Sequence, residues 1–241
     1  MGTSIAKPFL FKQFAIHQDR CTMKVGTDGV LLGAWVDVSG VGTALDIGAG
    51  SGVIAIMLGQ RASEAHIHAV EIEREAFDQA QANMRQAPWS DRLAIFHTAI
   101  QDYAAQHSGK YDLIVSNPPF FSGGTFSHQA DRNSVRHTVK LPHGDLLAAV
   151  RTLLHAEGRF GVVLPYIEGL RFQELARSYK LYASRILEVR PKQEKPVERL
   201  LMQFEKQERQ PQLEELVIQH DSPNEWTEAY RALTGAFYLY M

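Results

Sequence analysis

One glycine-rich segment restricts the fold of this chain more than any other. The strand-like Thr43-Ala44-Leu45 leads into Asp46-Ile47-Gly48-Ala49-Gly50-Ser51-Gly52, and a helical pattern of apolar residues begins directly afterwards at Val53. A tight turn from strand to helix is typical of open α/β sheets, and its glycines let the backbone approach a nucleotide-like ligand. Dinucleotide enzymes usually space these glycines as G-x-G-x-x-G, whereas here they alternate at every second position. The segment therefore predicts an α/β fold with a ligand site where this strand ends.

Strand and helix signals alternate along the rest of the chain, which is the pattern of an α/β protein. Apolar residues recur at helical spacing over residues 53–61, 73–86, 144–155 and 168–179, and Ser222-Pro223 is a typical helix start. Strands are expected at residues 43–45, 66–70, 93–99, 111–116 and 158–164, near Ile186 and Leu200, and at residues 216–218. We expect a single domain over residues 1–241, with an N-terminal extension at 1–35 and the core at 36–241.

The segment Asn117-Pro118-Pro119-Phe120 directly follows the apolar run at residues 111–116. The amide oxygen of Asn117 and the carbonyl oxygen of Pro118 can accept the two hydrogens of a planar NH2 group, and Phe120 offers a flat face for a base to stack on. Asn and Pro are also ordinary turn residues, so a simple strand-ending turn is the structural alternative. The chemistry that the segment favours is substitution on an exocyclic amine.

An acid follows the glycine turn at the distance where nucleoside-binding α/β domains place a ribose contact, about 20 residues. The strand-like residues 66–70 end in Glu71, whose carboxylate could accept both ribose hydroxyls. A solvated acid at a strand end is the alternative, and it is the interpretation that we give to the nearby Glu73 and Glu75.

The N-terminal part contains two further features. Thr27 and Asp28 open an apolar helical pattern, where Asp28 could serve as a helix cap or touch a ligand beside the glycine turn. Phe9, Phe11 and Phe14 indicate a half-buried strand, with stacking platforms for RNA as the less favoured alternative.

The composition is that of a compact enzyme domain. The chain has 241 residues, 45% of them hydrophobic, and 25 Lys and Arg against 27 Asp and Glu give a formal charge of −2. This charge argues against indiscriminate binding of nucleic acid, so any RNA contact must be local. The lone Cys21 fits a reducing compartment, and the start Met1-Gly2-Thr3-Ser4-Ile5-Ala6 has no signal-peptide core. No run is long enough to span a membrane, and the ten histidines show no metal-ligand spacing. We expect a cytoplasmic protein without a metal.

Two clusters of basic residues are candidates for RNA contact. The loop after the Asn117 segment, residues 123–140, contains Arg132, Arg136, His137 and Lys140, and contact with RNA is there as plausible as an ordinary polar loop. The second cluster is interleaved with Glu188, Glu194 and Glu198, a mixture that favours a solvated face; its members are Arg185, Arg190, Lys192, Lys195 and Arg199.

The motifs together resemble one enzyme family. The spacing D-x-G-x-G-x-G is similar to motif I of S-adenosylmethionine-dependent methyltransferases. With it, four further segments resemble the bacterial valine-tRNA (adenine-N6)-methyltransferases: residues 11–14, 26–35, 117–120 and 230–239. The resemblance implies a Rossmann-like class I methyltransferase fold, with a seven-stranded, mostly parallel sheet, a final antiparallel hairpin and helices on both faces. It also implies S-adenosyl-L-methionine as cofactor, S-adenosyl-L-homocysteine as product and tRNA as substrate, methylated on N6 of adenosine 37.

The resemblance also implies roles for single residues. The expected catalytic residues are Asn117, Pro118, Pro119 and Phe120. The expected cofactor-binding residues are Thr27, Asp28, Asp46, Gly48, Gly50, Gly52, Glu71, Ile72, Ile100, Asp102 and Asn117. Asp102 is assigned to the adenine amine, although the family often carries this acid a residue or two earlier, where this chain has Ile100. A surface Asp that starts a short helix is the alternative for Asp102. Phe120 stands where many relatives have Tyr.

Three classes of function stay open at this point. N6 methylation of an RNA adenosine is favoured. Methylation of another planar amine, a protein glutamine or guanine N2, uses the same N-P-P-[FY] motif. A cofactor-binding module without catalysis or a nucleotide-dependent oxidoreductase is disfavoured by the alternating glycines and by Asn117. We expect a monomer, with an oligomer left open.

Overall fold

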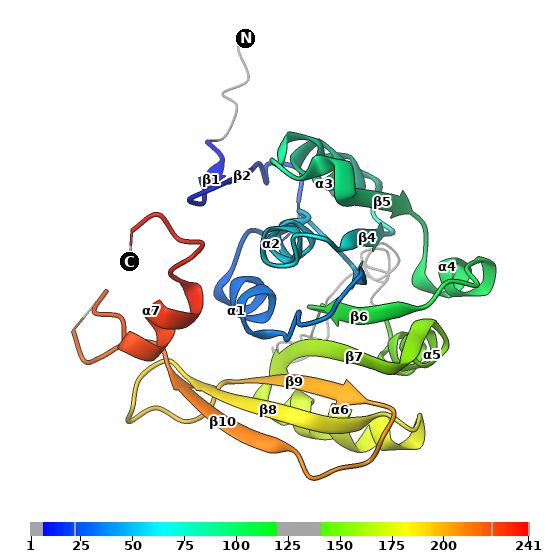
Figure 1. Cartoon of the computed structure of the whole chain (residues 1–241). Coiled ribbons are helices and arrows are strands. Elements are labelled where there is room, and N and C mark those ends of the chain that lie inside the picture. Colours follow the sequence, from blue (N-terminus) through cyan, green and yellow to red (C-terminus); the bar gives the residue numbers. More distant parts are fainter. Residues whose placement is uncertain (1–6, 22, 120–140, 223, 241) are drawn as a thin grey trace, which may run out of the picture.

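The structure is a computed structural model of the chain that describes residues 7–21, 23–119, 141–222 and 224–240. Helices and strands alternate along these residues (Figure 1). The strands are β1 (Phe9–Leu10), β2 (Ala15–Ile16), β3 (Thr43–Ile47), β4 (His66–Glu71), β5 (Leu93–His97), β6 (Tyr111–Ser116), β7 (Leu154–Pro165), β8 (Tyr182–Arg190), β9 (Arg199–Glu205) and β10 (Gln212–Val217). The helices are α1 (Thr27–Trp35), α2 (Val53–Arg61), α3 (Arg74–Gln86), α4 (Ile100–Gln106), α5 (His143–Leu153), α6 (Tyr166–Ser178) and α7 (Glu228–Thr234), with a 3-10 turn η1 (Ser90–Arg92).

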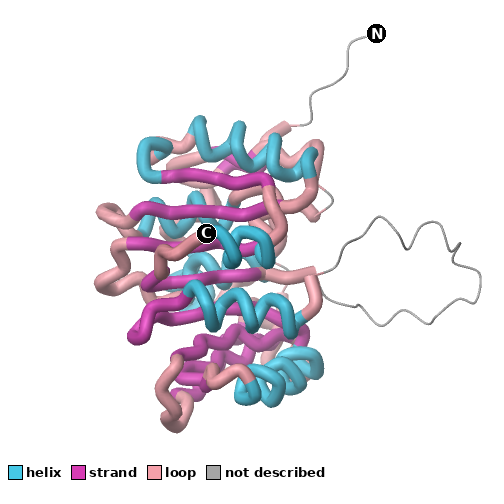
Figure 2. The backbone as a smooth tube through the Cα atoms, turned by 90° about the vertical axis from the view of Figure 1, so that its right-hand side faces the viewer, coloured by secondary structure: helices cyan, strands magenta, loops and turns pink. Residues whose placement is uncertain are grey.

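Over the described ranges, eight strands form the main sheet in the order β10-β8-β9-β7-β6-β3-β4-β5, and Figure 2 shows them lying side by side across the molecule. The five strands β3 to β7 are mutually parallel, whereas β9 runs antiparallel to both of its neighbours, β7 and β8. The Rossmann-like sheet with a final antiparallel hairpin is therefore confirmed. The structure adds an eighth strand, because β10 continues the sheet parallel to β8.

Two hydrophobic cores lie on opposite faces of the sheet. Along β6, Leu113 and Val115 belong to the core formed with α1 and α2, and Ile114 belongs to the core formed with α4, α5 and α6. Successive side chains of a strand point to opposite faces, so a strand covered on both sides is apolar at every position. This explains the continuous apolar run at residues 111–116 and confirms helices on both faces.

The N-terminal hairpin of β1 and β2 packs against the C-terminal part of the chain. The amide of Lys12 donates to the carbonyl of Phe237 over 2.8 Å, and the rings of Phe11 and Tyr238 stack with their centroids 5.9 Å apart. Phe11 and Phe14 are buried, with 4% and 8% of their surfaces exposed. The expected strand is limited to Phe9 and Leu10, because Phe11 and Phe14 lie in the turn between β1 and β2; these two rings are part of the core rather than platforms for RNA.

Helix α1 packs closely on α2, and this contact brings the first turn of α1 to the glycine turn. A Cβ atom on Gly33 would lie 2.9 Å from the sulfur of Met57, which is closer than unbonded atoms approach, so the present packing of the two helices depends on a glycine here. Residues of α1, α2 and β3 share one hydrophobic core.

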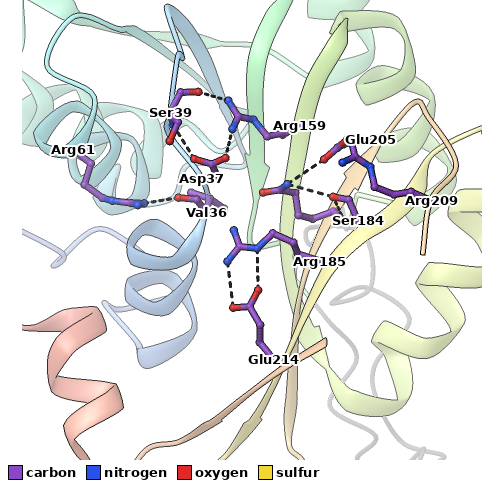
Figure 3. Close-up of polar contacts among 11 residues, drawn as sticks. Val36, Asp37, Ser39, Arg61, Arg159, Ser184, Arg185, Glu205, Arg209 and Glu214 are labelled. Carbon is purple, nitrogen blue, oxygen red and sulfur yellow. Dashed lines mark hydrogen bonds and ion pairs between the residues drawn. The ribbon is translucent and has the colours of Figure 1, made fainter. Parts of the chain in front are cut away.

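Polar contacts connect these helices to the later strands, as Figure 3 shows. Arg159 on β7 forms an ion pair with Asp37, which follows α1, and Arg61 at the end of α2 donates to the carbonyl of Val36 over 2.7 Å. On the other side, Arg185 on β8 donates to Glu214 on β10 through two hydrogen bonds of 2.9 and 3.2 Å. The pair of Arg185 and Glu214 links β10 to its neighbour β8.

Several element boundaries differ from the sequence-based expectation. Strand β7 begins at Leu154 instead of residue 158, and β10 spans Gln212–Val217 instead of residues 216–218. The last helix begins at Glu228 instead of Ser222, and the hydroxyl of Thr227 accepts from the amide of Tyr230 as its cap. Helix α5 ends at Leu153, because β7 already begins at Leu154. Pro223 lies outside the described residues.

Candidate active site

Two adjoining cavities open at the carboxyl edge of the parallel strands, where open α/β folds bind their ligands. The smaller cavity has a volume of about 190 Å³ and lies over the ends of β3, β4 and β6, next to the start of α4. The larger has a volume of about 450 Å³. It extends from the glycine turn to the first turn of α1, the end of β8 and the start of β9. Both are lined by Met23, Gly48, Gly50 and Asn117.

The glycine turn forms the floor between the cavities. Gly48 and Gly50 adopt left-handed backbone angles, with φ of +73° and +56°, and a Cβ atom on either would meet nothing within 4 Å. The Cα atoms of this turn therefore border open space, so a ligand can approach the backbone more closely than a side chain would allow. Gly52 lines neither cavity. It precedes α2, where a Cβ atom would lie 3.3 Å from the Cβ of Ala80 on α3.

Asp46 supports the turn from below. Its carboxyl group is fully buried and accepts a hydrogen bond of 3.1 Å from the amide of Ala55 in α2. Burial, with a smaller contribution from the charge of Glu71, raises the pKa of Asp46 to about 7. Because Asp46 lines neither cavity, the geometry does not bring it to a ligand as the sequence-based expectation had it. It positions the start of α2 instead.

Glu71 is held rigidly at the end of β4. Its Oε2 accepts from the amide of Gly50 over 2.8 Å, and its Oε1 accepts from the amides of Ile72 and Glu73 over 2.8 and 2.9 Å. A carboxylate has about four acceptor positions, so these three donors leave capacity for about one ribose hydroxyl rather than the two expected. The neighbouring Ile72 is 41% exposed and lines the smaller cavity, where it offers an apolar surface to a flat ring.

The start of α4 supplies the next part of the smaller cavity. Thr98, Ala99, Ile100 and Gln101 line it, and Ile100 is buried. Asp102 is exposed in the first turn of α4 and is not among the lining residues. The structure thus brings Ile100 to the site. It leaves Asp102 as a surface acid in the first turn of α4, which is the alternative to a contact with adenine.

Asn117 stands at the boundary of the two cavities. The preceding Ser116 donates from its hydroxyl to the carbonyl of Ile47 over 2.8 Å, which ties the end of β6 to the glycine turn. The Oδ1 atom of Asn117 is shielded from solvent, and no group among the described residues donates to it. Pro118 and Pro119 line the smaller cavity, and Phe120 lies outside the described residues, as do residues 123–140 with Arg132, Arg136, His137 and Lys140.

Thr27 and Asp28 line the larger cavity together with Arg199, a member of the second basic cluster that the sequence did not place at the site. The N-cap of α1 is Gly26, so Asp28 is not the cap, and its Oδ2 accepts from Nε of Arg199 over 2.9 Å. Arg199 begins β9 and also lines this cavity, so the interpretation of its cluster as a solvated face was wrong for this residue. The two residues are far apart in sequence, and a basic residue at a strand start was the only local signal.

These surroundings suit S-adenosyl-L-methionine. The smaller cavity combines the apolar Ile72 and Ile100 for an adenine ring with Glu71 for a ribose. The larger cavity begins at Gly48 and Gly50 and reaches the carboxylate of Asp28, which pairs with Arg199 and would offer its remaining acceptor capacity to the ammonium group of an amino acid. The buried oxygen of Asn117 lies between these two regions.

Metal sites and membrane-spanning helices are both absent from the described ranges. No group of three or more His, Cys, Asp or Glu side chains in those ranges is arranged to hold a metal ion. Likewise, none of the helices described there combines the length and the apolar character that crossing a membrane requires.

The chain is similar to known methyltransferases in sequence and in structure. The methyltransferase small domain family matches residues 24–164. A tRNA1(Val) (adenine(37)-N6)-methyltransferase from Photorhabdus laumondii is 43% identical over 233 residues, which cover 96% of this chain and 95% of the relative. A protein of the same name from Escherichia coli O157:H7 is 44% identical over 234 residues, with coverages of 97% and 95%.

Two solved structures show the same fold. The crystal structure of a predicted O-methyltransferase from Agrobacterium tumefaciens has a TM-score of 0.68 at 15% identity and covers 87% of this chain and 96% of its own. The structure of Pyrococcus horikoshii TYW2 in complex with MeSAdo has a TM-score of 0.57 at 12% identity, with coverages of 86% and 74%. The sequence relatives span nearly the whole chain, and the chain belongs to the tRNA1(Val) (adenine(37)-N6)-methyltransferase family.

Proposed function

We propose that this protein transfers a methyl group from S-adenosyl-L-methionine to N6 of adenosine 37 in a valine tRNA. The observation that carries this is the Oδ1 atom of Asn117, a buried acceptor that no described residue satisfies, at the boundary of the two cavities. A buried polar atom without a partner is costly, and of the four such side-chain atoms among the described residues only that of Asn117 belongs to a residue that lines these cavities, where a ligand can supply the donor. The amino group of adenine is such a donor. The names of the curated relatives support the tRNA and the position.

The chain's contribution to the reaction is electrostatic. The lone pair of adenine N6 is delocalised into the ring, so the nitrogen is a poor nucleophile. Asn117 Oδ1 and the carbonyl oxygen of Pro118 would each accept one of its hydrogens and favour a pyramidal nitrogen. These hydrogen bonds strengthen as positive charge forms on the nitrogen, so they stabilise the transition state more than the bound substrate. When bound, S-adenosyl-L-methionine supplies an electrophilic methyl group on a sulfonium.

Positioning supplies the remainder of the rate. The hydrogen bond from Ser116 to Ile47 fixes the end of β6 against the glycine turn, and Glu71 fixes Gly50 from the other side. The group that accepts hydrogens from the base and the backbone that cradles the cofactor are therefore parts of one rigid edge of the sheet. Holding two reactants in such a geometry lowers the barrier by removing the entropy cost of bringing them together.

The target base must leave its stack to reach Asn117. Unstacking is cheaper in an anticodon loop than in a duplex, because a loop base has no Watson–Crick partner. The larger cavity of about 450 Å³ gives a base room to enter from the side of α1 and β9. A tRNA substrate supports a cytoplasmic location.

Incubation with labelled S-adenosyl-L-methionine tests the function. The pure protein is given an unmodified valine tRNA transcript, which is digested afterwards so that the methylated nucleoside can be identified by mass. We expect N6-methyladenosine from this transcript and none from a control transcript with guanosine at position 37. A different methylated nucleoside, or equal transfer to both transcripts, would contradict the proposal.

A further inference from the structure

The far wall of the larger cavity is built by the last third of the chain. Val189 and Pro191 at the end of β8, Glu198 and Arg199 at the start of β9, and Ile218 after β10 all line it, and Asn117 lines the same cavity. The segment that joins β8 to β9, residues 190–199, therefore forms part of the rim over the catalytic amide. We call these residues the β8–β9 rim.

The β8–β9 rim is positively charged in a protein that is not. It contains four basic residues and two acidic ones, whereas the whole chain has a formal charge of −2. Lys24, which is exposed before α1, lines the same cavity. At the cavity itself, Lys24 and Arg199 are accompanied by Asp28 and Glu198, so the excess of positive charge lies on the outer part of the rim, where a polyanion that approaches the cavity passes. The basic residues of the rim are Arg190, Lys192, Lys195 and Arg199.

The backbone of the rim is held in place. The amide of Lys195 donates to the carbonyl of Lys192 over 3.0 Å, and Nη1 of Arg190 donates to the carbonyl of Lys195 over 3.0 Å. Lys192 donates from Nζ to the carbonyl of Asp221 over 2.7 Å. A surface that is ordered before binding loses less conformational entropy when its ligand arrives.

Contacts with Asp28 and Glu198 help to orient Arg199. Its Nε donates to Oδ2 of Asp28 over 2.9 Å and its Nη1 donates to the carbonyl of Glu198 over 3.1 Å, while 30% of its side chain stays exposed. Ion pairs of this exposure contribute little to folding stability, so stability does not explain a fixed arginine at the mouth of the site. A guanidinium group carries a permanent charge that phosphate oxygens attract.

We propose that the β8–β9 rim, with Arg199 as its main contact and Lys195 and Lys24 as further ones, binds the backbone phosphates that flank the target adenosine. These contacts hold the RNA strand at the mouth of the larger cavity, so that the unstacked base points toward Asn117. The inference rests on the proposed function, because it takes an RNA strand as the substrate.

Arg199→Gln tests this with the valine tRNA transcript as probe. We expect the KM for the transcript to rise about tenfold, the loss that follows removal of a hydrogen-bonded charge. The slope of log K against log salt concentration, measured by fluorescence anisotropy, should fall by about 0.7 because one phosphate contact is lost. The kcat and the affinity for S-adenosyl-L-homocysteine should stay within about twofold, since neither depends on a phosphate contact.

Two further variants keep the test independent of folding. Lys195→Gln changes an exposed side chain, so it should fold normally and show a smaller rise in KM together with a reduced salt slope. Arg177→Gln is the matched control. Arg177 is an exposed arginine in the last turn of α6 that pairs with Glu208, and it lies shortly before the start of β8, whereas the rim follows the end of that strand. This control should leave all four quantities unchanged.

The outcomes separate the rim from the reaction. Unchanged KM and salt slope in both Arg199→Gln and Lys195→Gln would overturn the rim, even with full methylation by the unaltered protein. A loss of cofactor affinity in Arg199→Gln as large as the rise in its KM for the transcript would also overturn the proposal, since Arg199 would then serve the cofactor. Methylation of a different nucleoside by the unaltered protein contradicts the proposed function, while the salt slopes still decide whether the rim holds phosphates.

Discussion

The amide of Gly50 donates to Oε2 of Glu71 over 2.8 Å, so the glycine turn and the acid at the end of the next strand form one unit. We expect Glu71→Gln to raise the dissociation constant for S-adenosyl-L-homocysteine by about tenfold to a hundredfold, because a hydrogen bond to a charged acceptor is lost and the turn loosens. The free energy of unfolding should fall by about 1–3 kcal/mol, because an amide cannot satisfy all three backbone donors. Isothermal titration and urea unfolding measure the two effects.

The control for this prediction is Glu75→Gln, which neutralises an exposed acid in the first turn of α3. Cofactor affinity should be unchanged in this variant. Equal affinities for Glu71→Gln and the unaltered protein would remove Glu71 from the cofactor site.

Asn117→Ala should reduce turnover far more than binding. Removal of one preorganised group that stabilises charge in a transition state lowers kcat by about a hundredfold to a thousandfold. The affinity for S-adenosyl-L-homocysteine should change less than threefold, about 0.6 kcal/mol, because the Oδ1 atom is reserved for the substrate. Single-turnover methylation of the tRNA transcript measures the first quantity and calorimetry the second. Gln101→Ala removes another amide from the wall of the smaller cavity and should retain turnover; an equal loss of turnover in both variants would contradict the role of Asn117.

Gly33→Ala should destabilise the contact between α1 and α2. The new Cβ would lie 2.9 Å from the sulfur and 3.1 Å from the terminal methyl group of Met57, so the two helices must separate or Met57 must change its rotamer. Overpacking of this kind costs about 1–3 kcal/mol. The matched variant is Gly29→Ala on the same helix, where the nearest atoms would be 3.7 Å away. Its stability should be equal or slightly higher, since alanine favours a helix over glycine by about 1 kcal/mol. Urea unfolding compares them, and equal stabilities would contradict the close packing at Gly33.

The buried carboxyl group of Asp46 should make stability depend on pH. Its pKa is raised to about 7 in the folded protein, mainly by burial, whereas an unfolded chain has an Asp pKa of about 3.9. Between these values the folded protein binds the proton and the unfolded chain does not, so the free energy of unfolding falls as the pH rises from about 4 to 7. Asp46→Asn should remove this component, which is on the order of a few kcal/mol. Urea unfolding at pH 5 and pH 7.5 compares the unaltered protein with Asp46→Asn. If both proteins lose the same free energy of unfolding between these two pH values, the assignment is refuted.

The sequence predicted those parts of the site that depend on neighbours in the chain. The glycine turn, Glu71 and Asn117 each end a strand, and parallel strands bring their carboxyl ends to one edge, so the period of the apolar residues was enough to place them. Asp46 belongs to the same motif, but its direction could not be predicted. Its role follows from the contact with Ala55, which depends on the angle between β3 and α2.

Arg199 shows where this reasoning ends. Its partner Asp28 precedes it by 171 positions, and no local pattern distinguishes an arginine at a cavity from one on a solvated face. The alternation with glutamates in its cluster pointed to solvent, and tertiary structure overrode that signal.

The last helix has a different explanation. Ser222-Pro223 is a good helix start in isolation, yet Thr227 with Glu228 behind it also fits a cap and a first-turn acid, and the structure uses this second signal. Two competing start signals within a few residues cannot be ranked without the packing of Tyr230 in the core.

The far wall of the larger cavity has a consequence for how this family can diversify. The methyltransferase small domain match ends at residue 164, and the residues that build that wall all come later in the chain. The first part can thus stay constant as a methyl-donating unit while the strands from β8 onward change the acceptor that reaches Asn117. Exchange of β8 to β10 between relatives would then transfer substrate choice without rebuilding the cofactor site. The pair of Arg185 and Glu214 would be exchanged together, because both residues lie on those strands.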